Sequence, residues 1–151
     1  MRDIRLLREA FEPGTFIGPF TAANPGLGGV ATFVGEVRAD TGVEALELSH
    51  YDPLTLPGMH ALADAAFARF ELMGLMMLHR VGVMLPGEPI VCVSAAARHR
   101  RDAIQAIDFA MDHLKSDAWF WKREKRAGEW HWIEPRAEDH ADLKRWNNLQ
   151  S

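Results

Sequence analysis

The sequence predicts an α+β domain, with a mostly antiparallel sheet and flanking helices. Segments that alternate apolar and polar residues, the pattern typical of strands, recur along the chain. Segments with apolar residues three or four positions apart, the pattern typical of helices, lie among them. The expected order is β, β, α, β, β, α, β, α. With 151 residues, 48% of them hydrophobic, the chain is long enough for one domain with its own core, which we expect to span residues 1–151.

The first half of the chain is expected to hold a loop, two strands and a helix. Residues 11–29 are dense in proline and glycine, which favours a loop with short turns. The alternation in residues 29–38 predicts a strand, and residues 43–51 alternate again, so we expect a hairpin between the two. A helix is predicted over residues 57–74, because apolar residues recur every four positions after a proline and a glycine ends the pattern.

The second half is expected to hold three more strands and two helices. Residues 75–84 and 89–97 are predicted to be strands joined by a tight connection, and residues 101–116 an amphipathic helix. The apolar face of that helix is expected to consist of Ile104, Ile107, Met111 and Leu114. A final strand is predicted at 129–135 and a short C-terminal helix at 137–148. Between these last two helices, Lys125 and Arg126 are expected in a turn.

Composition argues against several classes of protein. Seventeen Lys and Arg against 21 Asp and Glu give a formal net charge of −4, so the chain has no overall field that would attract DNA, RNA or an anionic bilayer. Charges interrupt the apolar runs of the N-terminus, and no apolar run is long enough to span a membrane, so we expect a cytoplasmic protein. The single cysteine, Cys92, lies in an apolar run and is expected to be a buried packing residue.

Neither a nucleotide nor a metal is expected as a cofactor. The stretch GLGGVA at 26–31 fits the spacing of a dinucleotide-binding loop, but a predicted loop precedes it and a predicted strand follows it, which is the wrong order for that motif. The seven histidines show no spacing typical of metal ligands. We therefore expect neither a nucleotide cofactor nor a metal.

A basic cluster, Arg98 to Arg101, lies between a predicted strand and a predicted helix. Backbone N–H groups at a helix N-terminus, with arginine side chains beside them, suit a phosphate or carboxylate. A solvated basic turn is the alternative. Arg38, at the end of its predicted strand, has the same two interpretations.

The stretch HLKSDAWFWKREKRAGEWHWIE at 113–134 holds four of the five tryptophans. Lys115 has an obvious role in complementing the C-terminal dipole of its helix. Lys122 directly follows W-F-W. Bulky rings there would desolvate its ammonium and favour the neutral amine, which suits proton transfer. Alternatively, the rings form only an inert cation–π contact with Lys122. Residues 98–126 carry eight Lys and Arg against five Asp and Glu, a local excess that suits a small anionic ligand better than a long polyanion.

Several motifs stand in one order along the chain. They are F-x-G-x-V-R at 33–38, H-R-x-G-x-x-x-x-G-E at 79–88, H-R at 99–100, L-K at 114–115 and W-K-x-E at 121–124. In this order, over residues 28–135, the chain resembles the large, catalytic subunit of molybdopterin synthase. Each motif alone is weak, but their shared order is specific to that family.

The resemblance implies an α/β-hammerhead-type fold and a homodimer with a small ubiquitin-like sulfur-carrier subunit at each end, which together form a heterotetramer. Members of that family convert cyclic pyranopterin monophosphate into molybdopterin by installing two sulfurs as a dithiolene. The sulfur comes from a thiocarboxylate at the C-terminal Gly-Gly of the small partner, whose tail enters a pocket of the large subunit. The resemblance thus implies a sulfurtransferase of molybdenum cofactor biosynthesis.

The resemblance also implies the site residues. Lys115 and Lys122 match the two active-site lysines. The candidate substrate-binding residues are Glu36, Val37, Arg38, His99, Arg100, Met111, Arg123 and Glu124. A thiocarboxylate is already ionised, so the reaction needs a cation to steer it and an acid to protonate the leaving oxygen. We expect the two lysines to share these tasks, and which of them is the acid stays open.

The chain departs from the family pattern at four places. The connection at 38–46 is shorter than usual, and residues 52–56 are extra. Glu36 stands where a basic residue is common, and Ala118 where a proline is common. Two other functions stay open beside the enzyme: a single-stranded RNA-binding module that uses the Trp and Arg residues of 119–132 for stacking, and a non-catalytic scaffold for the small partner.

Overall fold

The computed structural model describes residues 1–39, 42–116, 119–134 and 137–148, and within them the chain forms eight strands and four helices. In chain order these are β1 (Arg2–Leu7), α1 (Pro13–Ala22), β2 (Gly29–Glu36), β3 (Ala45–His50), α2 (Asp52–Arg69), β4 (Leu72–Arg80), β5 (Gly82–Met84), β6 (Pro89–Ala97), α3 (Arg100–Ser116), β7 (Phe120–Arg126), β8 (Glu129–Ile133) and α4 (Ala137–Asn148). The predicted mixture of helices and mainly antiparallel strands is confirmed. None of the helices in the described part of the chain is long and apolar enough to cross a membrane.

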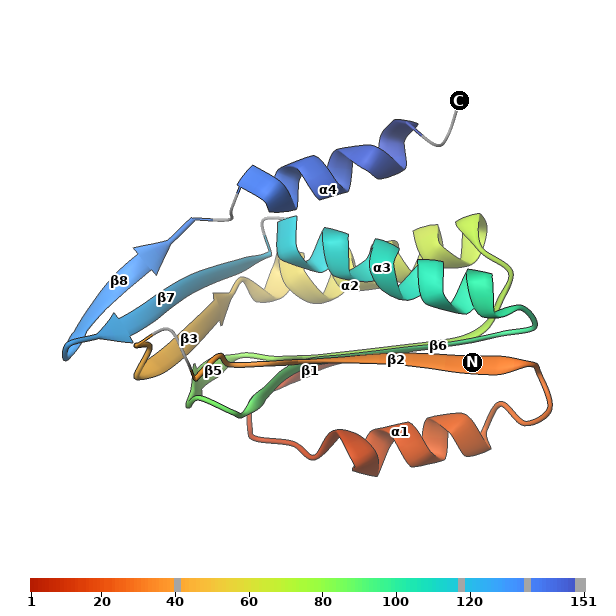
Figure 1. Ribbon diagram of the computed structural model, residues 1–151, viewed down its shortest axis with the longest axis horizontal. Coiled ribbons are helices and arrows are strands. Elements are labelled where there is room, and N and C mark those ends of the chain that lie inside the picture. The colour runs from red at the N-terminus through yellow and green to blue at the C-terminus, as the bar shows by residue number, and fades with distance from the viewer. Residues whose placement is uncertain (40–41, 117–118, 135–136, 149–151) are drawn as a thin grey trace.

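The first sheet has the strand order β1-β4-β6-β2 and forms the centre of the molecule. Only its β1–β4 pair is parallel. Helix α1 covers one face, while α2 and α3 lie on the other (Figure 1). Strands β4 and β6 are buried over seven consecutive residues each, because helices cover both of their faces. Such strands consist of continuous apolar runs rather than alternating ones.

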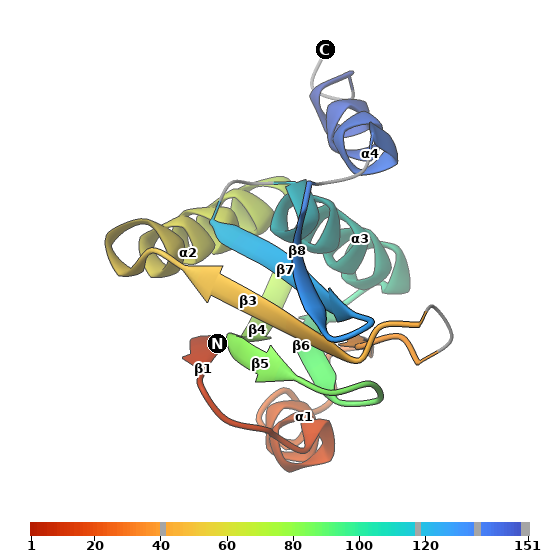
Figure 2. The ribbon, with the colours of Figure 1, turned by 90° about the vertical axis from the view of Figure 1, so that its left-hand side faces the viewer.

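The second sheet has the order β5-β3-β7-β8 and is antiparallel throughout. It lies at one end of the first sheet, as Figure 2 shows. The chain passes from β4 in the first sheet to β5 in the second through Val81 and Gly82. Gly82 has φ +97°, a backbone conformation that favours glycine. Apolar side chains fill the space between the two sheets: Val37, Leu46, Leu48, Met84 and Ile90.

The predicted hairpin between residues 29–38 and 43–51 is wrong. β2 pairs with β6 in the first sheet, whereas β3 pairs with β5 and β7 in the second. The predicted single strand over 75–84 is likewise divided between the two sheets at Val81. Both errors have one cause, since alternation within a segment does not say which sheet will receive it.

Residues 11–29 are not a loop throughout, because they contain α1. Pro13 lies in the first turn of α1, where backbone N–H groups have no partner within the helix, so the missing N–H of proline costs nothing. Phe20 is only 1% exposed and packs the helix against the sheet. Strand β1 was not expected, since its charges interrupt the apolar pattern. It is an edge strand that pairs with β4 alone.

Three further expectations need correction. α2 starts at Asp52 rather than at residue 57, so residues 52–56, which the sequence predicts to be extra, form its first turn. Lys125 and Arg126 lie in β7 and not in a turn, because β7 and β8 form a hairpin around Gly128. Ile104 is 57% exposed and does not belong to the buried face of α3.

Candidate functional site

The two candidate lysines lie at the same end of the molecule. Lys115 is exposed in the last turn of α3, and Lys122 is exposed on β7, the next element along the chain (Figure 1). The side chain of Lys122 is 45% exposed, and its Nζ lies 3.5 Å from Oε1 of Glu124. The ammonium groups are therefore accessible to a ligand that approaches beside the second sheet.

Glu124 holds two cations on one face of β7. Alternate residues of a strand share a face, so Lys122, Glu124 and Arg126 point the same way. Arg126 donates two hydrogen bonds to Oε2 of Glu124, at 3.0 and 3.2 Å, while Lys122 approaches Oε1. In the register of the sheet, Lys122 lies opposite Leu48 and Glu124 opposite Leu46, and both leucines are buried. Lys122, Glu124 and Arg126 thus form a charged cluster above an apolar base.

Arg123 belongs to the opposite face of β7. Its Nε donates a hydrogen bond of 2.6 Å to Oε1 of Glu47 on β3. Its guanidinium also lies 4.5 Å from the ring centre of Trp130 and 5.7 Å from that of Trp132. Arg123, a candidate substrate-binding residue, is thus engaged with neighbouring strands and is directed away from the face that carries Lys122.

The end of β2 brings Arg38 to the same end of the molecule. Val37 is 5% exposed, its N–H donates to the carbonyl of Glu88 at 3.0 Å, and its carbonyl accepts from the N–H of Gly87 at 2.8 Å. Arg38 follows directly and is exposed, as Glu36 is on the other side of Val37. The backbone of Val37, directly before Arg38, is therefore fixed by two hydrogen bonds.

A partly buried ion pair supports that turn. Arg80 donates from Nη1 to Oε2 of Glu88 at 2.8 Å, and the same oxygen accepts the N–H of Leu85 at 3.0 Å. These hydrogen bonds, with the charge of Arg80, keep the pKa of Glu88 below its usual value. The H-R-x-G-x-x-x-x-G-E motif thus closes the turn that holds Val37.

His99 and Arg100 lie far from the lysines within one chain. Both are exposed where α3 begins, and Lys115 lies in its last turn. Fifteen helical residues separate Arg100 from Lys115, which corresponds to about 22 Å along the axis. Since β2 runs antiparallel to β6, Arg38 also lies at the opposite end of the first sheet from His99. Met111, one turn before Lys115, is half-buried against the core.

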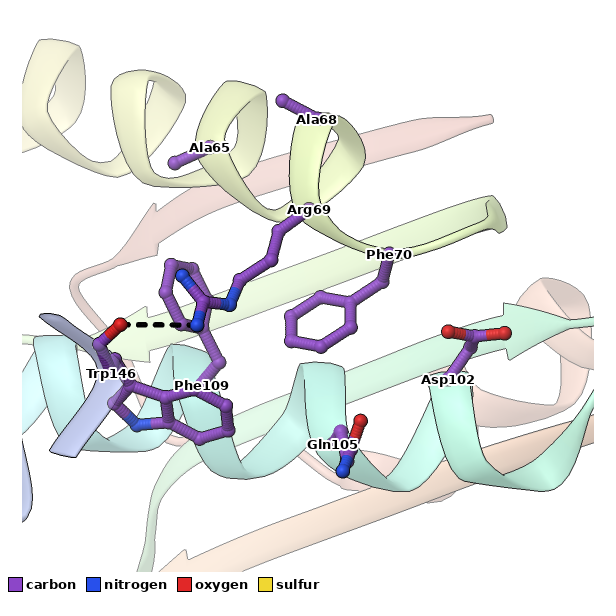
Figure 3. A pocket seen from close by; sticks show the side chains of 8 residues that line it. All are labelled: Ala65, Ala68, Arg69, Phe70, Asp102, Gln105, Phe109 and Trp146. Carbon is purple, nitrogen blue, oxygen red and sulfur yellow. Dashed lines mark hydrogen bonds between the residues drawn. The ribbon is translucent and has the colours of Figure 1, made fainter. Parts of the chain in front are cut away.

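A groove of about 690 Å³ between α2, α3 and α4 contains no candidate site residue. Figure 3 shows Arg69 within it, donating a hydrogen bond of 3.0 Å to the carbonyl of Trp146. The Trp146 side chain is 5% exposed, and its Nε1 donates to Asp112 at 2.7 Å. The groove is lined by Ala65, Ala68, Arg69, Phe70, Asp102, Gln105, Phe109 and Trp146. It is a seam where α4 packs on the helical layer.

The first residue of β7 is anchored on a buried histidine. The ring of Phe120 stacks on that of His79, with 4.0 Å between centroids and 18° between planes. His79 Nδ1 lies 3.0 Å from the carbonyl of Arg80, a distance at which its N–H donates. Burial lowers the pKa of His79 to about 4, and the backbone hydrogen bond opposes this shift only in part. The anchor therefore depends on a neutral imidazole.

The free energy of unfolding is expected to decrease with falling pH because of His79. Between pH about 6.5 and about 4, the unfolded chain binds a proton at this position that the folded chain does not, which costs roughly 1.4 kcal/mol per pH unit. Urea unfolding at several pH values should show this slope, and His79→Gln should lack it. His60→Gln, at an exposed position on α2, is the matched control and should keep it. Equal slopes in both variants would contradict the assignment.

Comparison with known proteins identifies the family. The family model described as MoaE protein matches residues 8–117. The chain belongs to the MoaE family. It is 45% identical to the molybdopterin synthase catalytic subunit of Caulobacter vibrioides over 145 residues, which cover 95% of this chain and 97% of that relative. The suspected resemblance is thereby confirmed.

Solved structures of the MoaE family share the fold described above. The molybdopterin biosynthesis MoaE protein from Burkholderia ambifaria superposes with a TM-score of 0.82 at 37% identity, over 97% of this chain and 99% of that one. A protein–protein complex of subunits 1 and 2 of molybdopterin-converting factor from Helicobacter pylori reaches a TM-score of 0.74 at 19% identity, over 88% of this chain and 91% of that one. At that identity the likeness concerns the fold alone.

Proposed function

We propose that this chain is the catalytic subunit of a molybdopterin synthase. In this function, sulfur passes from the C-terminal thiocarboxylate of a small ubiquitin-like partner to cyclic pyranopterin monophosphate, and the product is the dithiolene of molybdopterin. The observation that supports it most is the exposed pair Lys115 and Lys122 at one end of the molecule, in a chain 45% identical to a molybdopterin synthase catalytic subunit. The protein is then a sulfurtransferase of molybdenum cofactor biosynthesis, and we expect it in the cytoplasm.

The chemistry of the transfer suits two lysines. A carbon–sulfur bond forms at the pterin side chain while a carbon–oxygen bond breaks, so the departing oxygen requires a proton. Water then hydrolyses the bond between the sulfur and the terminal glycine carbonyl, which releases the partner with an ordinary carboxylate. The sulfur of a thiocarboxylate is an anion and needs a positive charge to guide it. Lys122 meets either need, because its side chain is 45% exposed and its ammonium stays accessible beside Glu124. Arg38, at the same end of the molecule, is proposed to bind the substrate phosphate.

The separation of His99 and Arg100 from the lysines supports a site built from two protomers. A substrate-sized molecule does not extend over the roughly 22 Å of α3 between Arg100 and Lys115. We therefore infer that, in a homodimer, His99 and Arg100 of one protomer contribute to the site that contains the lysines of the other. A small subunit bound to each protomer completes a heterotetramer.

The proposed function is tested by reconstitution. Purified protein is mixed with a thiocarboxylated small subunit and cyclic pyranopterin monophosphate, and the dithiolene product is measured. Product is expected with the thiocarboxylated partner and not with the same partner ending in an ordinary carboxylate. Folded protein that captures the partner but forms no product would support the scaffold function instead. Salt-dependent binding of single-stranded RNA without either result would support the RNA-binding alternative.

A further inference from the structure

We propose that Thr55 and Gly58 on α2 hold Trp119 and thereby position Lys122 relative to Lys115. This inference rests on the proposed function, because it assigns a role to the surroundings of the two lysines. Thr55 and Gly58 are called the Trp119 seat below. They are positioning residues and not catalytic ones, since they act through Trp119 and contact no substrate.

The first contact of the seat is a buried hydrogen bond. The Thr55 side chain is 0% exposed, and its Oγ1 donates to the carbonyl of Trp119 at 2.8 Å. Sixty-four positions separate the two residues, so this bond joins the start of α2 to the segment just before β7. The bond is partly buried, and an intramolecular hydrogen bond of this kind contributes about 0.5–1.5 kcal/mol toward holding this segment in place.

The second contact requires a glycine. A Cβ atom at position 58 would lie 2.5 Å from both Cε2 and Nε1 of the Trp119 indole and 2.9 Å from its Cζ2. Such distances are far below van der Waals contact. The indole therefore lies directly on the backbone of α2, in space that any side chain at position 58 would occupy. Trp119 also packs against the main core cluster, so moving the ring away from α2 would disturb those contacts.

Two consecutive rings then fix the start of β7. Trp119 is held by α2, and Phe120 is stacked on His79 of β4. Lys122 follows two residues later, on the same face of the strand as Phe120. Lys115 is fixed separately, at the end of α3. The position of Trp119 on α2 thus determines how far, and in which direction, the ammonium of Lys122 lies from that of Lys115.

The seat uses the residues in which this chain departs from the family pattern. Residues 52–56, which the sequence predicts to be extra relative to that pattern, form the first turn of α2. Thr55 is one of them. The inserted turn therefore contributes to the site by fixing Trp119, which gives the departure a function.

Gly58→Ala is the most direct test. Alanine stabilises a helix by about 1 kcal/mol relative to glycine, so the variant should fold, but its methyl group displaces the indole. We expect kcat to fall roughly ten- to a hundredfold, with KM for the pterin changed less than about twofold, since a small misplacement of a catalytic group affects the chemical step. Gly14→Ala, in the first turn of α1 where an added Cβ meets nothing within 4 Å, is the matched control and should keep wild-type kcat. Equal kcat values for the two variants would overturn the proposal.

Two further variants separate positioning from a general loss of stability. Thr55→Ser keeps the hydroxyl donor and should retain most of the activity, whereas Thr55→Val keeps the shape and should lose it in kcat. In the double variant Gly58→Ala/Trp119→Ala the clash is absent, so the added methyl should have no effect beyond that of Trp119→Ala alone. Additive effects in the double variant would contradict a coupling between Gly58 and Trp119.

A readout that does not depend on turnover distinguishes failure of the seat from failure of the proposed function. The chain has only four lysines, at positions 115, 122, 125 and 144. After reductive ¹³C-methylation, their NMR signals can be assigned with single Lys→Arg variants. Gly58→Ala should shift the Lys122 signal and leave that of Lys144, on α4, in place. An unchanged Lys122 signal would refute the seat even if the enzyme is active, and a shifted signal would support it even if no dithiolene forms.

Discussion

Lys122→Ala is expected to reduce kcat about a hundredfold or more, because loss of a positioned acid or of an electrostatic contact to the transition state has effects of that size. Lys122 is exposed, so its removal should change the free energy of unfolding by less than about 0.5 kcal/mol. Single-turnover formation of the dithiolene with saturating thiocarboxylated partner measures the chemical step. Thermal unfolding of the same preparation shows whether the variant is folded.

The strand itself provides the control for that experiment. Lys125 lies on β7 three residues away, and the alternation of the strand places it on the opposite face from Lys122. Lys125→Ala removes the same charge from the same strand and should retain near-normal turnover. Lys115→Ala should resemble Lys122→Ala. Near-normal turnover in both Lys115→Ala and Lys122→Ala would show that the catalytic assignment is wrong.

A mixture of two inactive proteins is expected to regain activity. One carries Lys122→Ala and the other carries His99→Ala with Arg100→Ala. If each site combines lysines from one protomer with His99 and Arg100 from the other, a mixed dimer has one intact site and one site with every lesion. Random exchange makes half of the dimers mixed, so total activity should reach about a quarter of the wild-type value. Turnover is measured after dissociation and reassociation, with mixed dimers counted by native mass spectrometry.

A second mixture is the control for complementation. Lys122→Ala combined with Lys115→Ala should stay inactive, because both lysines of a site come from one protomer and no mixed dimer has an intact pair. Activity in this control, or its absence from the first mixture despite proven exchange, would contradict a site shared between protomers. In the second case, His99 and Arg100 would be a solvated basic turn, the alternative that the sequence left open.

The sequence predicted those elements that carry their own pattern. β6, α3, β8 and α4 were all expected close to where they lie, because strand alternation or helical spacing is complete within each. The pairing of β2 with β6 was not predictable, because a short connection after β2 suggested a hairpin, whereas the strand that pairs with β2 comes from a distant segment of the chain. The charges of β1 and the prolines and glycines around α1 concealed two elements whose apolar contacts come from distant segments.

The candidate site was only partly predictable for similar reasons. The spacing W-K-x-E placed Lys122 and Glu124 on one face of a strand, once that segment was recognised as a strand. The distance between Arg100 and Lys115 was also available, because a 17-residue helix has a known length. The Trp119 seat could not be predicted from the sequence, because no local pattern links Gly58 to a tryptophan sixty-one positions later. A glycine within a helix and a threonine in its first turn are both common, so neither Gly58 nor Thr55 stands out in the sequence. Only their contacts with Trp119 in the folded protein show their proposed role.

The length of α3 has a consequence for how this chain can vary in evolution. The helix joins the turn with His99 and Arg100 to the end that carries Lys115. Loss or gain of one residue inside it would shift one end by about 1.5 Å and rotate it by about 100° relative to the other. Met111 would then leave the core, and Lys115 would point to another side of the molecule. We therefore expect substitutions on its exposed face to be tolerated, whereas an insertion or deletion inside α3 should impair the site even where every side chain named above is kept.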